Sequence, residues 1–287
     1  MPAPSTYFIL YTGIILIAAN GLFAKGIPLD ALNITFLRSL IALLAIVLFL
    51  TLFKRSPKIN NTKTLFGLYG LGVLMGVHWI TFFHSMQIST IAIGMLSLFT
   101  FPVITVFMEG AVNKQWPHKR DIVSAILVLA GIILMVSDKP ITLSSNTLQG
   151  VLWGVLSALL FASRNVMQKY YFTDVSSDKL MLHQMLAIIL LLVVFLDFSS
   201  IGNLTNHNWL AIIALGLITT AGAHTLLVIS YKRLPAKTVA MISCLQPVIA
   251  ALLGWVFINE RPSLFIIIGG AIILTVAIYE SLINRHA

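Results

Sequence analysis

The chain has 287 residues, 59% of them apolar and only 9% charged, and its mean hydropathy is +0.98. A soluble domain carries roughly 25% charged residues, so this composition excludes a water-soluble globular protein and predicts one whose solvent is lipid. The net charge of +9 comes from basic residues scattered through short loops, which favours a role in membrane topology over nucleic-acid binding. The single cysteine, Cys244, excludes a disulfide framework and a cysteine-rich metal site.

Long continuous apolar runs recur along the whole chain, and each is long enough to cross ~30 Å of hydrocarbon as a helix. Lipid requires each backbone group to be hydrogen-bonded within its own element, and the short alternating segments of a barrel are absent from the sequence. We therefore predict an all-α integral membrane protein with ten transmembrane helices. The expected spans, in chain order, are 6–24, 31–53, 64–84, 89–109, 121–137, 149–170, 179–196, 208–230, 236–257 and 263–281.

The basic residues are distributed unequally between the two sides of these spans. If the N-terminus is cytoplasmic, 13 of the 18 Lys and Arg residues lie on the inside, three lie outside, and two fall within spans. Inner loops of membrane proteins carry an excess of Lys and Arg. The distribution predicts that both termini are cytoplasmic and that the chain is a multi-pass protein of the cell inner (plasma) membrane.

The chain matches itself when it is shifted by 145 residues. Phe101-Pro102-Val103-Ile104 then falls on Gln246-Pro247-Val248-Ile249, and Asn20 falls on Asn165. We infer two five-helix repeats, residues 1–140 and 141–287. Because five is an odd number, the second repeat enters the membrane the other way up, which is a common transporter construction. Such an inverted repeat places the substrate site near the bilayer midplane and predicts alternating access.

Several segments carry a resemblance to a known family. They are Phe36-Leu37-Arg38-Ser39-Leu40-Ile41-Ala42, His78-Trp79-Ile80-Thr81-Phe82-Phe83, Leu245-Gln246-Pro247-Val248-Ile249, Ile258-Asn259-Glu260-Arg261-Pro262 and Gly269-Gly270. With these, nearly the whole chain resembles the drug/metabolite transporter superfamily with two EamA-type domains. The resemblance implies a central cavity lined by spans one to four and six to nine, with spans five and ten at the periphery. It also implies export or exchange of amino acids, related metabolites or drug-like compounds. The chain departs from a strict repeat at Gln115, which matches Glu260, and at Arg38, which matches His183.

Two arginines lie within predicted spans, where a charge costs several kcal/mol and usually faces a cavity or a partner. Arg38 is a candidate anchor for a substrate carboxylate, because its planar guanidinium binds carboxylates in a bidentate manner. The alternative is a structural hydrogen bond to backbone carbonyls or to Asn20. Arg164, beside Asn165, is a candidate cavity residue, and its alternative is snorkelling to the inner interface.

Four titratable residues are candidates for carrying a coupling proton: His78, His183, His224 and Glu109. Histidine titrates near neutral pH, so an imidazole inside a span can exchange a proton. The alternative for each histidine is a neutral ring bonded to a neighbouring helix. For Glu109 the alternative is a carboxylate near a Lys or Arg at the cytoplasmic interface.

Pro102 and Pro247 occupy matching positions in spans four and nine. Proline removes a helix hydrogen bond, so both predict kinks, and their matched placement suggests a gating role. Gln246 can contact a ligand or the freed carbonyls. Aromatic residues such as Trp79 and Phe82 can line an apolar cavity, or they simply pack. The predicted substrate-binding set is Asn20, Arg38, His78, Trp79, Phe82, Arg164, Asn165, His183, His224 and Gln246.

The favoured function is a secondary transporter, an exporter or exchanger of small metabolites that works by alternating access. A lipid scramblase or flippase on the same scaffold is the alternative. An integral-membrane enzyme is disfavoured because the sequence lacks His-Glu-x-x-His, Gly-x-Ser-x-Gly and paired intramembrane aspartates. No Walker-type loop, cofactor site or metal site is expected. The expected partners are a small-molecule substrate and membrane lipids, with a homodimer left open.

Overall fold

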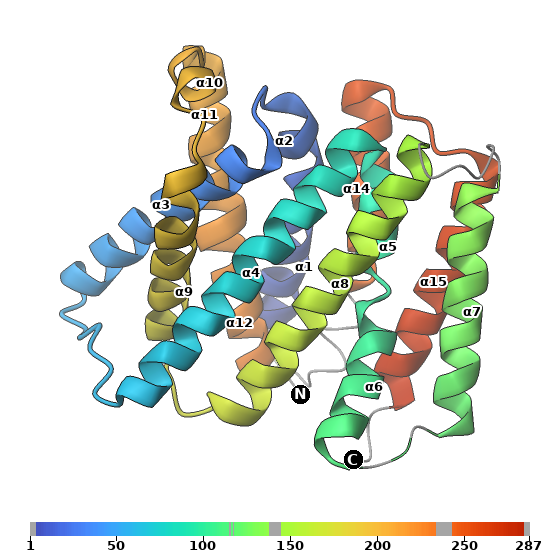
Figure 1. The fold of residues 1–287 in the computed structure, drawn as a ribbon, viewed down its shortest axis with the longest axis horizontal. Helices are drawn as coiled ribbons and strands as arrows, with labels where there is room; N and C mark the ends of the chain where they lie inside the picture. The colour runs from blue at the N-terminus through green and yellow to red at the C-terminus, as the bar shows by residue number, and fades with distance from the viewer. Residues whose placement is uncertain (1–3, 115, 117, 138–144, 234–242, 284–287) are drawn as a thin grey trace.

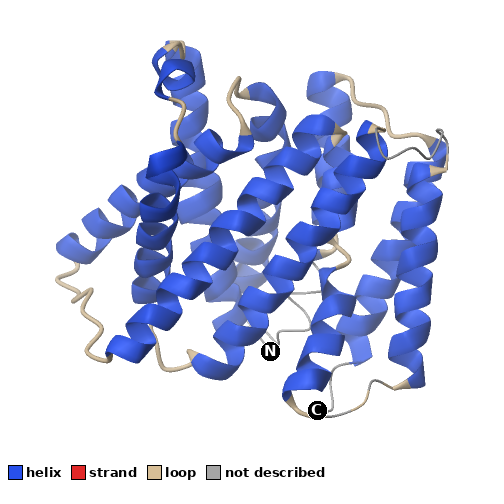
Figure 2. Ribbon diagram, viewed as in Figure 1, coloured by secondary structure: helices blue, strands red, loops and turns tan. Residues whose placement is uncertain are grey.

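The computed structural model of the protein describes residues 4–114, 116, 118–137, 145–233 and 243–283. Within these residues every regular element is helical (Figure 2). The elements are α1 (Pro4–Ala18), α2 (Asn20–Gly26), α3 (Ala31–Leu52), α4 (Thr62–Ile88), α5 (Ile91–Leu98), α6 (Phe101–Val112), α7 (Lys119–Val136), α8 (Asn146–Tyr171), α9 (Ser177–Leu192), the 3-10 helix η1 (Val193–Phe195), α10 (Phe198–Gly202), α11 (Asn206–Ala214), the π-helix η2 (Leu215–Gly222), α12 (Ala223–Arg233), α14 (Gln246–Ile258) and α15 (Leu264–Ile283).

Seven helical stretches among the described residues are long and apolar enough to cross a membrane. They are Thr6–Gly26, Ala31–Leu52, Thr62–Ile88, Ile91–Val112, Asn146–Tyr171, Ser177–Phe195 and Asn206–Leu227. Gln246–Ile258 and Leu264–Val276 are shorter apolar helices. The predicted helical membrane protein is thus confirmed. The start of the predicted ninth span, residues 236–242, and the predicted boundary between repeats at 140 and 141 lie outside the described residues, as do Gln115 and Pro117.

The ends of the helices carry the capping residues that polar helix termini require. Asp30 accepts a hydrogen bond from the backbone N–H of Asn33 at the start of α3, and Asn61 and Ser145 cap α4 and α8 in the same way. Large apolar side chains remain exposed on the outside of the bundle, as with Phe8 at 73% and Val256 at 71%. Such an apolar outer surface suits a lipid environment.

The first long helices of the two predicted repeats cross the bundle in opposite directions (Figure 1). α1 rises from the lower face of the view to α2 at the upper face, whereas α8 descends from the upper face to the lower face. The packing also follows the repeat. α4 packs on α8 and α1 packs on α12, and a shift of 145 residues exchanges these two pairs. α6 packs on α8 and α14 packs on α1, and this pair of contacts is exchanged in the same way.

The two prolines mark matching interruptions of the helices. α5 ends at Leu98 and α6 begins at Phe101, with Pro102 in its first turn. α14 begins at Gln246, with Pro247 in its first turn. The residues between the segments, 99–100 and 244–245, form turns at positions 145 apart in the sequence. The helix is therefore interrupted at both places, as expected for a residue that cannot donate a backbone hydrogen bond.

Candidate functional site

Arg38 lies in the second turn of α3, and none of its surface is exposed. Its guanidinium lies over the ring of Trp79, 4.2 Å from the ring centroid, and 5.0 Å from that of Phe83. Its Nε donates a hydrogen bond to Thr220 Oγ1 at 3.0 Å, so the partner that the structure provides is Thr220 rather than Asn20. Both terminal nitrogens, Nη1 and Nη2, are buried without a hydrogen-bond partner in the described residues.

The π-helix η2 positions Thr220 against Arg38. Thr220 Oγ1 donates to the carbonyl of Leu215 at 2.8 Å, five residues earlier. Gly216 allows η2 to approach α3 closely, because an added Cβ there would lie 2.6 Å from Ile41 and 3.3 Å from the carbonyl oxygen of Arg38. π-helical segments are rare in proteins, and those that do occur are often found at functional sites.

Two of the predicted histidines lie beside this arginine. His78 Nδ1 is 2.7 Å from Ser157 Oγ on α8, and its ring stacks on Phe161 and Phe82 at 4.8 and 6.1 Å. The ring of His224 is 6.1 Å from that of Trp79. Phe83, whose ring centroid is 5.0 Å from the Arg38 guanidinium, lies 5.9 Å from the ring of Phe82. The structure therefore brings together Arg38, His78, Trp79, Phe82 and His224.

Arg164 belongs to a second polar group, between α8 and α9. Its Nη2 donates to Gln184 Oε1 at 2.9 Å and its Nη1 donates to Asn165 Oδ1 at 2.9 Å. Two further buried atoms, Gln184 Nε2 and Gln168 Oε1, have no hydrogen-bond partner among the described residues. The four ion pairs found in the described part of the chain include neither Arg38 nor Arg164. Both arginines are therefore positive charges without an acidic partner there.

Other predicted site residues lie elsewhere. His183 Nε2 contacts the backbone carbonyl of Pro57 at 3.1 Å, in the connection after α3. Glu109 forms an ion pair with Lys169 at 2.7 Å near the lower ends of α6 and α8. Asn20 and Gln246 are both buried, and the Oδ1 of Asn20 has no hydrogen-bond partner within the described residues. The roles predicted for these four residues stay predictions.

A cavity of about 800 Å³ lies between α1, α3, α9, η2 and α12. Its walls are largely apolar, with Phe49, Leu217 and Ile229 among them, and His224 also lines it. Its polar end holds Arg55 and Asp178, whose side chains pair at 3.2 Å. These two residues follow α3 and open α9, at the lower face of Figure 1. The cavity thus extends from Arg55 and Asp178 to His224, whose ring lies 6.1 Å from that of Trp79.

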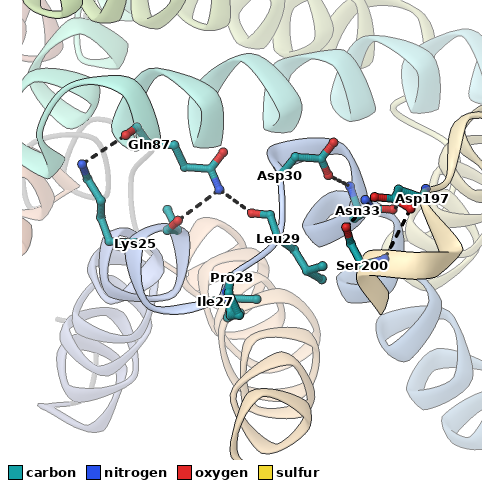
Figure 3. A pocket seen from close by; sticks show the side chains of 10 residues that line it. Lys25, Ile27, Pro28, Leu29, Asp30, Asn33, Gln87, Asp197 and Ser200 are labelled. Carbon is teal, nitrogen blue, oxygen red and sulfur yellow. Dashed lines mark hydrogen bonds between the residues drawn. The ribbon is translucent and has the colours of Figure 1, made fainter. Parts of the chain in front are cut away.

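The upper face holds a polar contact that the sequence did not indicate, and Figure 3 draws two of its side chains, Lys25 and Gln87. Lys25 Nζ donates to the backbone carbonyl of Ser89 at 2.7 Å and pairs with Glu260 Oε1 at 3.3 Å. Gln87 Nε2 donates to the carbonyls of Ala24 and Leu29 at 3.1 and 2.8 Å. The only sequence signal was that Glu260 has no acidic counterpart in the first repeat.

A small polar pocket of about 330 Å³ lies beside this contact, lined by Lys25, Gln87, Asn33 and Asp197 among others. Asn33 Oδ1 accepts a hydrogen bond from the backbone N–H of Asp197 at 3.3 Å. Hydrogen bonds from Ser199 and Ser200 lower the pKa of the Asp197 carboxyl to about 2, so that it is ionised at neutral pH. The hydrogen bond between Asn33 and Asp197 thus holds the start of α10 against the start of α3.

Comparison with known proteins places the chain in a family. The model of the EamA-like transporter family matches residues 4–137 and 148–279. An uncharacterized transporter of Archaeoglobus fulgidus (strain ATCC 49558 / DSM 4304 / JCM 9628 / NBRC 100126 / VC-16) is 26% identical over 91% of this chain and 90% of its own length. The uncharacterized transporter YxxF of Bacillus subtilis (strain 168) is 24% identical over 69% of this chain, and the match spans 64% of that relative.

A third relative, the uncharacterized transporter YwfM of Bacillus subtilis (strain 168), is 30% identical over 67% of this chain and 64% of its own length. A solved structure described as "Crystal structure of protein" superposes with a TM-score of 0.66 at 19% identity and covers 98% of both chains. At this identity the likeness concerns the fold. Two matched segments that together cover most of the sequence show that this chain belongs to the EamA-like transporter family.

Proposed function

We propose that the protein is a secondary transporter that exports or exchanges small organic solutes bearing a negatively charged group across the cell inner membrane. The observation that carries this proposal is the fully buried guanidinium of Arg38, whose two terminal nitrogens have no partner among the described residues. A buried charge left unpaired is costly, so a site of this kind favours a ligand that supplies the missing acceptor. A carboxylate matches two parallel guanidinium N–H groups.

The surroundings of Arg38 narrow the ligand further. The guanidinium of Arg38 lies over the rings of Trp79 and Phe83, which attract its positive charge but accept no conventional hydrogen bond from its two terminal nitrogens. Arg164 adds a second positive charge without an acidic partner in the described part of the chain. Two cations without acidic partners among the described residues favour a small organic anion such as a carboxylate. The buried oxygens of Asn20 and Gln168, which have no hydrogen-bond partner within the described residues, belong to the start of α2 and the last turn of α8, so they are not assigned to this ligand.

Transport by alternating access is supported by the difference between the two ends of the bundle. The 800 Å³ cavity reaches the lower face, whereas the Lys25–Glu260 contact lies at the upper face. We propose ten spans in two inverted five-helix repeats with both termini cytoplasmic. The opposed directions of α1 and α8 and the exchanged packing pairs support this arrangement. In this scheme one repeat rocks against the other about the site near Arg38.

The test is counterflow into proteoliposomes with a panel of labelled amino acids, monocarboxylates and nucleobases. For the compound that accumulates, we expect Arg38→Ala to weaken binding by about 30-fold or more, because truncating one partner of a buried charge pair costs about 2–5 kcal/mol. Arg120→Ala, which removes a half-exposed arginine at the start of α7, is the matched control and should transport normally. Unchanged affinity and flux in folded Arg38→Ala would rule out the anchor.

A further inference from the structure

We propose that Lys25 and Glu260 form a latch that holds the upper end of the bundle closed, and that this latch must break before the central site opens to that side. The proposal goes beyond the transport function above by assigning the closure to two named side chains. It needs no knowledge of the substrate, so it can be tested even if the proposed substrate class is wrong.

Lys25 is held at the point where three chain segments meet. It is the next-to-last residue of α2, and its ammonium reaches across to the connection between α4 and α5. There it donates to the carbonyls of Ser89 and Gln87 at 2.7 and 3.2 Å, and it pairs with Glu260 at 3.3 Å. The two carbonyls accept from two of the three N–H donors of the ammonium, and Glu260 balances its charge.

Glu260 is held in place by the end of α14. Asn259 adopts the left-handed conformation with φ of 56°, and the next N–H, that of Glu260, donates to Gly254 O at 3.1 Å. This cap turns the chain so that Glu260 Oε2 accepts a hydrogen bond from the N–H of Ile91 at 2.7 Å, in the first turn of α5. A carboxylate at a helix N-terminus is stabilised by the helix dipole.

The latch joins the two repeats. Lys25, Ser89 and Ile91 belong to residues 1–140, and Glu260 belongs to residues 141–287. A rocking of one repeat against the other must therefore separate Glu260 from both of its partners. Gln87 reinforces the first repeat separately, because both carbonyls to which its side chain donates lie in residues 24–29.

The latch is also of a strength that permits opening. The side chains of Lys25 and Glu260 are 23% and 19% exposed, so water can replace their contacts when they separate. Ion pairs at such partly exposed positions are weak compared with buried ones. The sequence predicts a one-sided latch, because Lys25 and Glu260 match Tyr170 and Gln115 in the shifted alignment, and neither of these residue types is charged at neutral pH.

The experiment measures opening directly, by thiol labelling of a residue beneath the latch. Ala24 is only 1% exposed, lines the small upper pocket and accepts the hydrogen bond from Gln87. Ala24→Cys is made in a Cys244→Ser background and placed in nanodiscs, where both faces meet water. We expect Glu260→Gln to raise its rate of labelling by a hydrophilic maleimide about three- to tenfold, as suits a partly exposed ion pair at a helix N-terminus.

Two further variants separate the latch from a general loosening of the protein. Lys25→Met breaks the same pair from its other side and should raise the rate to a similar extent. Lys169→Met breaks the lysine–carboxylate pair with Glu109 at the lower face and should leave the rate at the parental value. Parental rates in both Glu260→Gln and Lys25→Met, or an equal increase in Lys169→Met, would overturn the latch.

A covalent lock supplies the complementary test. Lys25→Cys with Glu260→Cys, joined by a short bifunctional maleimide, should abolish counterflow of whichever compound the parent protein transports, and the uncrosslinked double variant should retain it. Full counterflow in the crosslinked protein would contradict the latch. If the parent transports no compound in the panel while the labelling rates still change as expected, the proposed substrate class fails and the latch stands.

Discussion

Two buried polar residues, Arg38 and His78, differ in how completely the fold satisfies them. His78 has its Nδ1 against Ser157, and Ser157 Oγ also donates to the His78 carbonyl at 3.1 Å. Arg38 has one bonded nitrogen and two without a partner among the described residues. A satisfied polar pair fixes two helices together, whereas unsatisfied buried donors are expected where a ligand binds. The hydrogen bonds of His78 are those of a residue that joins two helices, whereas those of Arg38 leave donors for a ligand.

Ser157→Ala should destabilise the protein by about 0.5–1.5 kcal/mol, because it removes a hydroxyl that contacts both Nδ1 and the carbonyl of His78, while the Ser157 carbonyl remains 3.1 Å from Nδ1. Thermal unfolding of the purified protein in detergent measures the change. Ser163→Ala is the matched control, since Ser163 Oγ donates to the carbonyl of Leu159 in its own helix at 2.7 Å. Equal midpoints for Ser157→Ala and Ser163→Ala would show that the Ser157 contact contributes nothing to stability.

Helix α8 shows how small residues decide the packing of an element. An added Cβ at Gly150 would lie 2.2 Å from Ser89 Oγ, and one at Gly154 would lie 2.4 Å from Ser97 Cβ. Ser85 Oγ donates to the carbonyl of Gly150 at 2.5 Å. Small residues let helix backbones approach closely enough for such bonds to form. The positions of Gly150 and Gly154 thus fix α8 against α4 and α5, around His78.

Gly154→Ala should lower stability by about 1–3 kcal/mol through overpacking against α5. Gly70→Ala, in α4, has no atom within 4 Å of the added Cβ and should be neutral or stabilising by up to about 1 kcal/mol. Thermal unfolding of the two variants side by side provides the comparison. A Gly154→Ala protein as stable as Gly70→Ala would mean that the interface adjusts freely.

At the scale of the whole molecule, the two faces of the bundle carry different chemistry. The connection after α3, with Arg55 and Lys58, lies at the lower face, and the region around α10 and α11 lies at the upper face (Figure 1). The excess of Lys and Arg in the lower loops predicts that this face is cytoplasmic. In this orientation the 800 Å³ cavity faces the cytoplasm and the proposed latch faces outward, which agrees with the proposed export.

Cysteine labelling tests this orientation. Asn203 and Ser56 are exposed at opposite faces, and each is changed to Cys in a Cys244→Ser background. We expect Asn203→Cys to react with a membrane-impermeant maleimide in intact spheroplasts, and Ser56→Cys to react only after permeabilisation. The reverse pattern would place both termini outside and would make the latch an inner closure.

The sequence by itself predicted the lipid environment, the helical fold, the family and the two arginines that lie within spans. These features follow from local composition and from a repeat along the chain, so they need no knowledge of contacts. Arg38, His78, Trp79, Phe82 and His224 were all predicted as site residues, and they lie together. The kinks at Pro102 and Pro247 were predictable for the same reason, because the missing N–H is a property of the residue itself.

Only the tertiary structure decided which side chains meet. Thr220 lies 182 residues from Arg38, and Glu260 lies 169 residues from Ile91. A hydropathy pattern carries no information about such distant partners. His183 matches Arg38 when the sequence is shifted by 145 residues, yet in the structure its Nε2 contacts the backbone carbonyl of Pro57, in a loop. Lys25 is one of the three basic residues that the sequence places outside the membrane, with no sign of a partner. The packing of α2, α5 and α14 brings Glu260 to it, because ion pairs between helices depend on how the helices pack.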